Sequence, residues 1–150
     1  MARKYLFPNL AWSSYLLWCF LFLSIVGCSR AQIDPNVSLK TVADFEKAKD
    51  FVVNRDYASA IPILSKCTES GAIQSQLLGE VLGVRAIAYI HTGDLEKALQ
   101  DIEGLESIEG GTAMVHGLKY FYWQKSGNVS KAQLELSLAR RIDPNFKSPE

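Results

Sequence analysis

Residues 93–102 read GDLEKALQDI, and residues 127–136 read GNVSKAQLEL. The two segments align without a gap at a spacing of 34 residues. The aligned pairs are Gly93 with Gly127, Lys97 with Lys131, Ala98 with Ala132 and Ile102 with Leu136. A spacing kept over this length indicates an internal repeat, which is the strongest signal of fold in this chain.

The pattern extends beyond these two segments. Upstream, Ala86 aligns with Tyr120 and Tyr89 with Trp123, again 34 residues apart. An earlier copy occupies residues 55–64 (RDYASAIPIL), 38 residues before the second, and we expect the four extra residues in a turn at 70–75. Residues also recur at the three- and four-residue steps of a helix. These stripes are Leu39, Val42, Phe45, Ala48 and Val52; Leu78, Leu82, Arg85, Ala86 and Tyr89; and Leu134, Leu138 and Ile142.

A 34-residue period with these features resembles the tetratricopeptide repeat. The shared features are a small residue followed by an aromatic residue (Ala86 and Tyr89), a Gly-Asp or Gly-Asn turn (Gly93 and Gly127), a small residue early in the second helix (Ala60, Ala98 and Ala132), and a closing Asp143-Pro144. The resemblance covers about residues 42–146. It implies an all-α fold: a short solenoid of about three helical hairpins, placed after an N-terminal signal or anchor segment.

Each shared feature has a physical reason. Glycine adopts the left-handed conformation that ends a helix, and Asp94 and Asn128 can cap the helix that follows. Alanine lets two helices approach closely. The pattern also has departures: Arg55 stands where the other copies have glycine, Pro62 falls inside a predicted helix, Tyr120 takes the usually small position, and the second copy ends in Gly110-Gly111.

The first thirty residues read as a targeting segment. Arg3 and Lys4 precede 25 uncharged residues, and the stretch 10–26 is nearly all apolar. This layout is typical of a secretory signal peptide. At its end, residues 25–28 (IVGC) resemble the lipobox of bacterial lipoproteins, in which a lipid is joined to the cysteine sulfur and the chain is cut before it. The resemblance implies lipidation at Cys28, and we expect the fatty-acyl chains to anchor the protein stably to a membrane.

This interpretation divides the chain into a signal peptide at 1–27, a tether at 28–37, a helical-repeat domain at 38–146 and a tail at 147–150. Loss of Arg3 and Lys4 leaves 14 basic and 16 acidic residues, a charge of −2. Ser29 after the cysteine favours the outer membrane, by resemblance to enterobacterial sorting. In the alternative, the leader stays attached as a transmembrane anchor and Cys28 is unmodified, since 18 or more apolar residues can span a bilayer.

Several function classes have no support in the sequence. The net charge is zero, whereas a nucleic-acid binder needs a clustered basic face. No phosphate-binding glycine motif is present. The two histidines, His91 and His116, lack ligand partners at metal-site spacing. Cys67 is expected as a small core residue, and Glu96, Glu103, Glu106 and Glu109 as a solvated face. We therefore expect no enzyme activity, no cofactor and no metal.

In the family that the sequence resembles, peptides bind along a groove lined by the first helix of each repeat. Transferring the helix phase to this chain predicts the groove residues Phe45, Lys49, Glu80, Ile87, His91, Phe121, Gln124 and Lys125. The basic and asparagine pattern that clamps a terminal carboxylate in chaperone-docking members is not apparent, so we do not expect that kind of ligand.

Two apolar features point to further contacts. Residues 120–123 (YFYW) cover about 300° of a helix, so they cannot all face one core. We expect Tyr120 and Trp123 to pack inside and Phe121 or Tyr122 to be partly exposed or covered by a partner. Only eight residues follow Ile142, too few for the polar end cap that a solenoid needs. The stripe Leu134, Leu138 and Ile142 therefore predicts self-association or docking of a partner through the third repeat.

Together these observations favour a membrane-tethered adaptor or assembly factor of the bacterial cell envelope. It would face the periplasm and bind another envelope protein or peptide through its helical repeats. The alternative is a structural subunit of an envelope complex, held by an uncleaved transmembrane leader.

Overall fold

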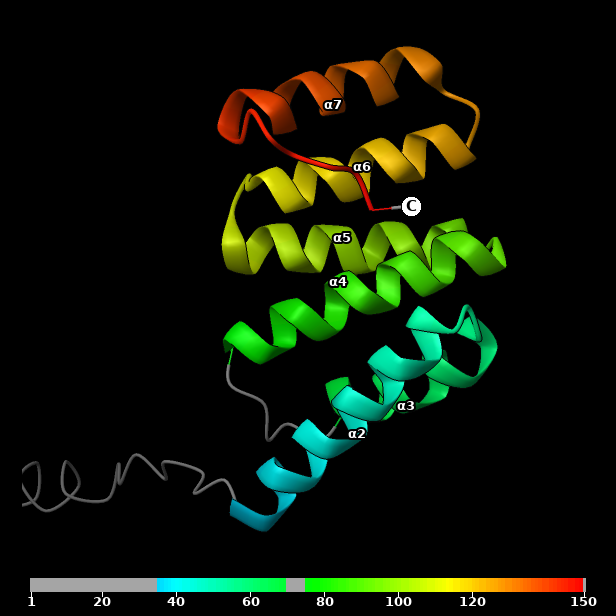
Figure 1. The fold of residues 1–150 in the computed structure, drawn as a ribbon, viewed down its shortest axis with the longest axis vertical. Coiled ribbons are helices and arrows are strands. Elements are labelled where there is room, and N and C mark those ends of the chain that lie inside the picture. The colour runs from blue at the N-terminus through cyan, green and yellow to red at the C-terminus, as the bar shows by residue number, and fades with distance from the viewer. Residues whose placement is uncertain (1–34, 70–74, 150) are drawn as a thin grey trace, which may run out of the picture. The chain divides into compact units, whose positions relative to one another are not determined.

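The computed structural model describes residues 35–69 and 75–149, and in these residues all regular secondary structure is helical (Figure 1). The helices are α2 (Pro35–Val53), α3 (Tyr57–Glu69), α4 (Ser75–Thr92), α5 (Leu95–Glu109), α6 (Ala113–Lys125) and α7 (Val129–Ile142). The predicted all-α fold is therefore confirmed.

The helices form three hairpins that stack side by side. α2 packs on α3, α4 on α5, and α6 on α7, while α3 contacts α4 and α5 contacts α6. The first helices of successive hairpins also touch, α2 with α4 and α4 with α6. In the described part of the chain, α3, α5 and α7 make no comparable contacts with one another. The stack thus brings its first helices together on one side, as a curved solenoid does.

The turns inside the hairpins follow the predicted chemistry. Gly93 and Gly127 have φ angles of 85° and 81°, which only glycine adopts without strain. The side chains of Asp94 and Asn128 accept hydrogen bonds from the backbone N–H groups of Lys97 and Lys131, at 3.4 and 3.1 Å. These contacts cap α5 and α7.

The small residues of the repeat lie where the helices meet. Ala60, Ala98 and Ala132 are at most 1% exposed. Ala60 and Ala98 each belong to a cluster of buried residues. One joins α2, α3 and α4 through Phe45, Ala48, Ala60, Leu64, Cys67 and Val81. The other joins α4, α5 and α6 through Ala86, Tyr89, Ile90, Ala98, Ile102, Leu105, Val115, Leu118 and Phe121. Because α4 contributes to both clusters, it links the second hairpin to the first and to the third.

The first helix begins earlier than predicted. α2 begins at Pro35, inside the expected tether, because proline suits the first turn of a helix, where a backbone N–H would lack a partner in any case. The last helix ends at Ile142, just before Pro144, so residues 143–146 of the predicted repeat domain are not helical. α4 begins at Ser75; the rest of the expected 70–75 turn, the leader, Cys28 and Ser29 lie outside the described residues. No helix within the described residues combines the length and apolar character needed to cross a membrane.

The predicted stripe on α2 is partly wrong. Leu39 and Val42 are 70% and 40% exposed, whereas Thr41, Phe45 and Ala48 are buried. The buried face therefore runs through positions 41, 45 and 48, at four- and three-residue steps. Because one residue of the buried face is the polar Thr41, the spacing of apolar residues alone does not reveal which face of α2 is buried.

Candidate functional site

The eight predicted groove residues lie at two cavities that neighbour each other along α4. We call them the apolar cavity, of about 350 Å³, and the polar cavity, of about 330 Å³. Phe45, Lys49, Glu80 and Ile87 line the apolar cavity, and His91, Phe121, Gln124 and Lys125 line the polar cavity. Ile87 and His91 are one helical turn apart, which makes the two cavities successive parts of one surface.

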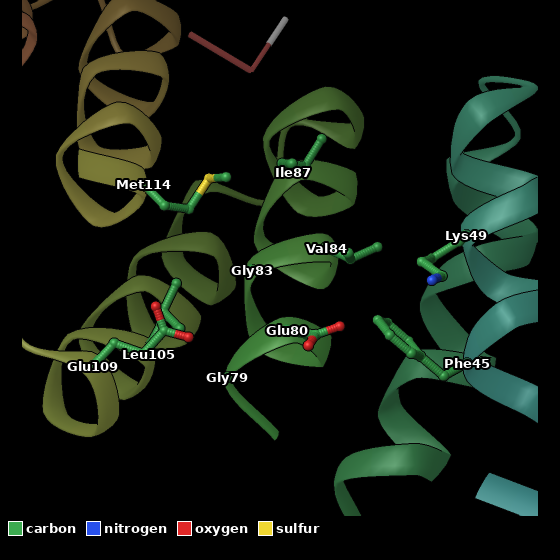
Figure 2. Close-up of a pocket in the computed structure, with 10 residues that line it drawn as sticks. All are labelled: Phe45, Lys49, Gly79, Glu80, Gly83, Val84, Ile87, Leu105, Glu109 and Met114. Atoms are coloured by element: carbon green, nitrogen blue, oxygen red, sulfur yellow. The ribbon is translucent and has the colours of Figure 1, made fainter. Parts of the chain in front are cut away.

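The apolar cavity lies between α2, α4, α5 and α6. Figure 2 shows Glu80 and Val84 pointing from α4 toward Phe45 and Lys49 of α2, with Met114 of α6 reaching toward α4 from the other side. Glycine at position 79 eases the packing of α4 on α5, because a Cβ there would lie 3.2 Å from Cδ1 of Leu105. The floor is hydrophobic, so it can take an apolar side chain of a partner.

Charged side chains of both signs surround this hydrophobic floor. Nζ of Lys49 lies 2.7 Å from Oε1 of Glu46 and 4.9 Å from the centre of the Phe45 ring. Glu80 and Glu109 supply carboxylates on the α4 and α5 sides (Figure 2). A surface with an apolar centre and a rim of both positive and negative charges suits an amphipathic segment better than a purely hydrophobic one.

Aromatic rings and cations build the polar cavity. The His91 ring stacks on Tyr57 at 4.2 Å, almost parallel, and lies 5.1 Å from the ring of Phe121. Nζ of Lys125 lies 5.5 Å from the centre of the Phe121 ring. Arg55 adds a second permanent cation, and among the described residues that line the cavity none is acidic. The cavity therefore favours carboxylates and carbonyl oxygens.

The prediction for the aromatic run on α6 is correct for the partly exposed Tyr122 but wrong about which residue packs inward. Phe121 is the buried member, at 5% exposed, whereas Tyr120, Tyr122 and Trp123 are half-buried. The face of α6 that meets α4 and α5 is set by Val115, Leu118 and Phe121. Trp123 instead lies under Lys131, whose Nζ is 4.0 Å from the centre of a Trp123 ring. Alignment with Tyr89 therefore misplaced the inward direction of this helix.

Sequence reasoning missed Arg55 as a site residue. Arg55 has a φ angle of 62°, which is strained for a residue with a side chain, and its side chain lines the polar cavity. The two equivalent turns use glycine at this position. An arginine at a turn position where the other two copies have glycine is the sequence signal that could have identified Arg55 as a site residue. Ser148 and Pro149 of the tail were also missed at this cavity.

A buried ion pair connects α4 to its neighbours α3 and α5. The guanidinium of Arg85 donates hydrogen bonds of 2.8 and 2.7 Å to the carboxylate of Asp101 on α5. It also donates to the hydroxyl oxygens of Thr68 and Ser65 on α3, at 2.9 and 3.3 Å. The hydrogen bond to Asp101 raises the pKa of Arg85 above its ordinary value. These contacts tie three helices together and fix the orientation of α4.

Other residues considered from the sequence have structural surroundings. Cys67 is buried, its Sγ lies 3.7 Å from the carbonyl oxygen of Thr41, and burial raises the pKa of its thiol. Glu106 accepts a hydrogen bond of 2.6 Å from Lys119, so it joins α5 to α6 rather than belonging to a solvated face. Across the described ranges, no group of three or more histidine, cysteine, aspartate or glutamate residues is arranged to hold a metal.

Comparison with known proteins adds no family assignment. No protein-family model matches the sequence, and no curated protein matches it at a significant level.

Proposed function

We propose that this protein is a membrane-tethered adaptor or assembly factor of the bacterial cell envelope, related to the tetratricopeptide-repeat family, that binds an extended segment of a partner. The main support is the position of the eight groove residues. The resemblance to the repeat family, carried onto the helix phase of this chain, predicts these residues, and they line two successive cavities on the side where the first helices meet. A continuous surface of this kind suits peptide binding better than a reaction centre.

The chemistry of the two cavities specifies the partner segment further. The apolar cavity accepts one or more hydrophobic side chains next to charged ones. The polar cavity, with Arg55 and Lys125, favours acidic or carbonyl groups at the adjoining part of the segment. A segment of an envelope protein with a block of apolar residues next to a block of acidic residues would fit the apolar cavity and the polar cavity together.

The membrane tether is the second part of the proposal, and it rests on the leader and on residues 25–28. A lipid at Cys28 confines the repeats to the membrane surface and raises the effective concentration of the partner there. Mass spectrometry of the mature N-terminus tests this part. A lipid-modified Cys28 as first residue supports the proposal, and an intact leader supports the transmembrane-anchored structural subunit instead.

Co-precipitation from detergent-solubilised envelopes tests the groove, using an antibody against the chain. Lys125→Glu and Gln124→Ala change exposed side chains of the polar cavity, so they should preserve the fold. Phe121→Ala is unsuitable because Phe121 is buried. Lys66→Glu on α3, which is also exposed, is the matched control. Recovery of every partner by Lys125→Glu at the level of the control would contradict the groove assignment.

A second contact surface is proposed at the end of the stack. Leu134 and Ile142 on α7 are 58% and 53% exposed, on the same stripe as half-buried Leu138. An apolar stripe at the last helix favours self-association or docking of a partner through the third hairpin. Sedimentation across protein concentration, comparing wild type with Leu134→Glu, measures it. A monomer at all concentrations that also keeps its partners in Leu134→Glu would refute this contact.

A further inference from the structure

The tail after α7 turns back across the first-helix side of the stack. Asp143 starts this turn: its side chain accepts a hydrogen bond of 3.0 Å from the backbone N–H of Asn145, and its carbonyl accepts one of 3.0 Å from Phe146. In Figure 1 the red tail runs from the end of α7 back over α6. Ser148 and Pro149 then line the polar cavity. Residues 143–149 therefore occupy part of the groove to which a partner is assigned above.

Phe146 enters a notch that a missing side chain leaves in α6. A Cβ built on Gly117 would lie 2.1 Å from Cζ of Phe146 and 2.8 Å from Cε1. The ring thus fills the volume that any other residue at 117 would take. Gly117 shares a face of α6 with Tyr120, Phe121 and Gln124, at the three- and four-residue steps of a helix. The notch and the polar cavity are therefore neighbouring parts of one site.

We propose that the Gly117 notch and the polar cavity form a recognition site for an extended segment that carries an aromatic side chain followed, about three residues later, by an acidic group. The spacing comes from the tail itself, where Phe146 fills the notch and Ser148 and Pro149 reach the cavity. The acidic preference comes from Arg55 and Lys125. Residues 143–149 are the internal occupant of this site and compete with any partner segment. This inference rests on the proposed groove function and names the ligand of its second half.

Competition by the tail has a calculable size. A segment joined by a short linker has an effective concentration of about 1 mM at its own site. If the free segment binds with a Kd of about 0.1 mM, the tail weakens an external ligand by about tenfold. Removal of the Phe146 ring should recover this factor without altering the helices.

The test uses the full chain in detergent and a fluorescent peptide of the tail sequence, DPNFKSPE, with DPNAKSPE as the matched control peptide. Fluorescence anisotropy measures binding to three forms: wild type, Phe146→Ala, and Phe146→Ala combined with Gly117→Ala. We expect Phe146→Ala to bind the phenylalanine peptide about tenfold more tightly than wild type does, and to bind the alanine peptide at least tenfold more weakly. The added Gly117→Ala should abolish the difference between the peptides.

A second measurement covers the case in which Phe146→Ala loses its fold. Gly117→Ala alone keeps α6 helical, because alanine favours helix more than glycine does. It should expel the tail, so that trypsin cuts after Lys147 at least tenfold faster than in wild type while the circular dichroism is unchanged. Equal cutting rates, equal binding of the two peptides, or equal binding by wild type and Phe146→Ala would each overturn the proposal.

These outcomes are separate from those of the adaptor function. The peptide assay needs no envelope partner, so selective peptide binding without any co-precipitated protein would sustain the site and refute the adaptor. Partners that co-precipitate through Lys125 while the peptide fails to bind would refute the aromatic site alone.

Discussion

Replacing Asp101 with asparagine tests the buried ion pair that orients α4. The change keeps the size of the side chain but removes the negative charge opposite Arg85. The side chains of Arg85 and Asp101 are 15% and 6% exposed, so water cannot replace the lost interaction well. Breaking a buried pair by removing one partner costs about 3–5 kcal/mol.

Two observations place the expected loss near the lower end of that range. Arg85 keeps its hydrogen bonds to Thr68 and Ser65, and asparagine can still accept one hydrogen bond from it. We therefore expect Asp101→Asn to lower the free energy of unfolding by about 3 kcal/mol. For a domain of this size the loss corresponds to a fall in Tm of about 12 °C.

Urea denaturation of a lipid-free form of the chain, followed by circular dichroism at 222 nm, measures this loss. A double-mutant cycle with Arg85→Met, Asp101→Leu and the combined variant isolates the pair. The coupling free energy should be about 2 kcal/mol, because the combined variant leaves no buried charge without its partner. A loss below about 1 kcal/mol in Asp101→Asn, or a coupling near zero, would refute the role given to this pair.

Three further predictions concern the repeat and its core. Ala98→Leu should lower the free energy of unfolding by about 1–3 kcal/mol, because position 98 is fully buried between helices, whereas Gln100→Leu on the exposed side of α5 should have little effect; equal effects in urea denaturation would contradict the packing. Arg55→Gly should raise the free energy of unfolding by about 0.5 kcal/mol, since relief of the left-handed strain exceeds the entropy that glycine adds to the unfolded chain, and a lower value would argue against strain. Burial, with a smaller contribution from Asp44, raises the pKa of Cys67 above 9.0. Its contribution to stability is therefore present below the unfolded pKa and is lost as the pH rises from about 9 through the folded pKa, so Cys67→Ala should flatten the alkaline part of the stability profile. An unchanged alkaline slope in that variant would assign the loss to other groups.

The order of the hairpins could be predicted from the sequence because each repeat contains residues that end one helix and start the next. Gly93, Gly127, Asp94 and Asn128 have few roles other than ending one helix and starting the next, so their spacing sets the hairpins. Alanine at 60, 98 and 132 then marks the closest approach of the helices. Helix ends and small packing residues depend on the local sequence, so they can be predicted from a single sequence.

The remaining features depend on contacts between distant residues. The predicted inward face of α6 was wrong because Phe121 is buried by residues of α4 and α5, which the aromatic run itself does not indicate. Arg85 lies among apolar positions, and its partner Asp101 is 16 residues away on a neighbouring helix. Nothing in the composition of residues 143–149 distinguishes a free tail from one that returns to Gly117. Such features required the three-dimensional arrangement.

The return of the tail has a practical consequence for anyone who labels this protein. Pro149 lines the polar cavity, so a purification tag or reporter domain fused after it would emerge at the mouth of the ligand site. Such a fusion would either displace residues 143–149 from the site or keep them bound there. Ligand affinities measured on the fusion would then depend on the label as well as on the protein.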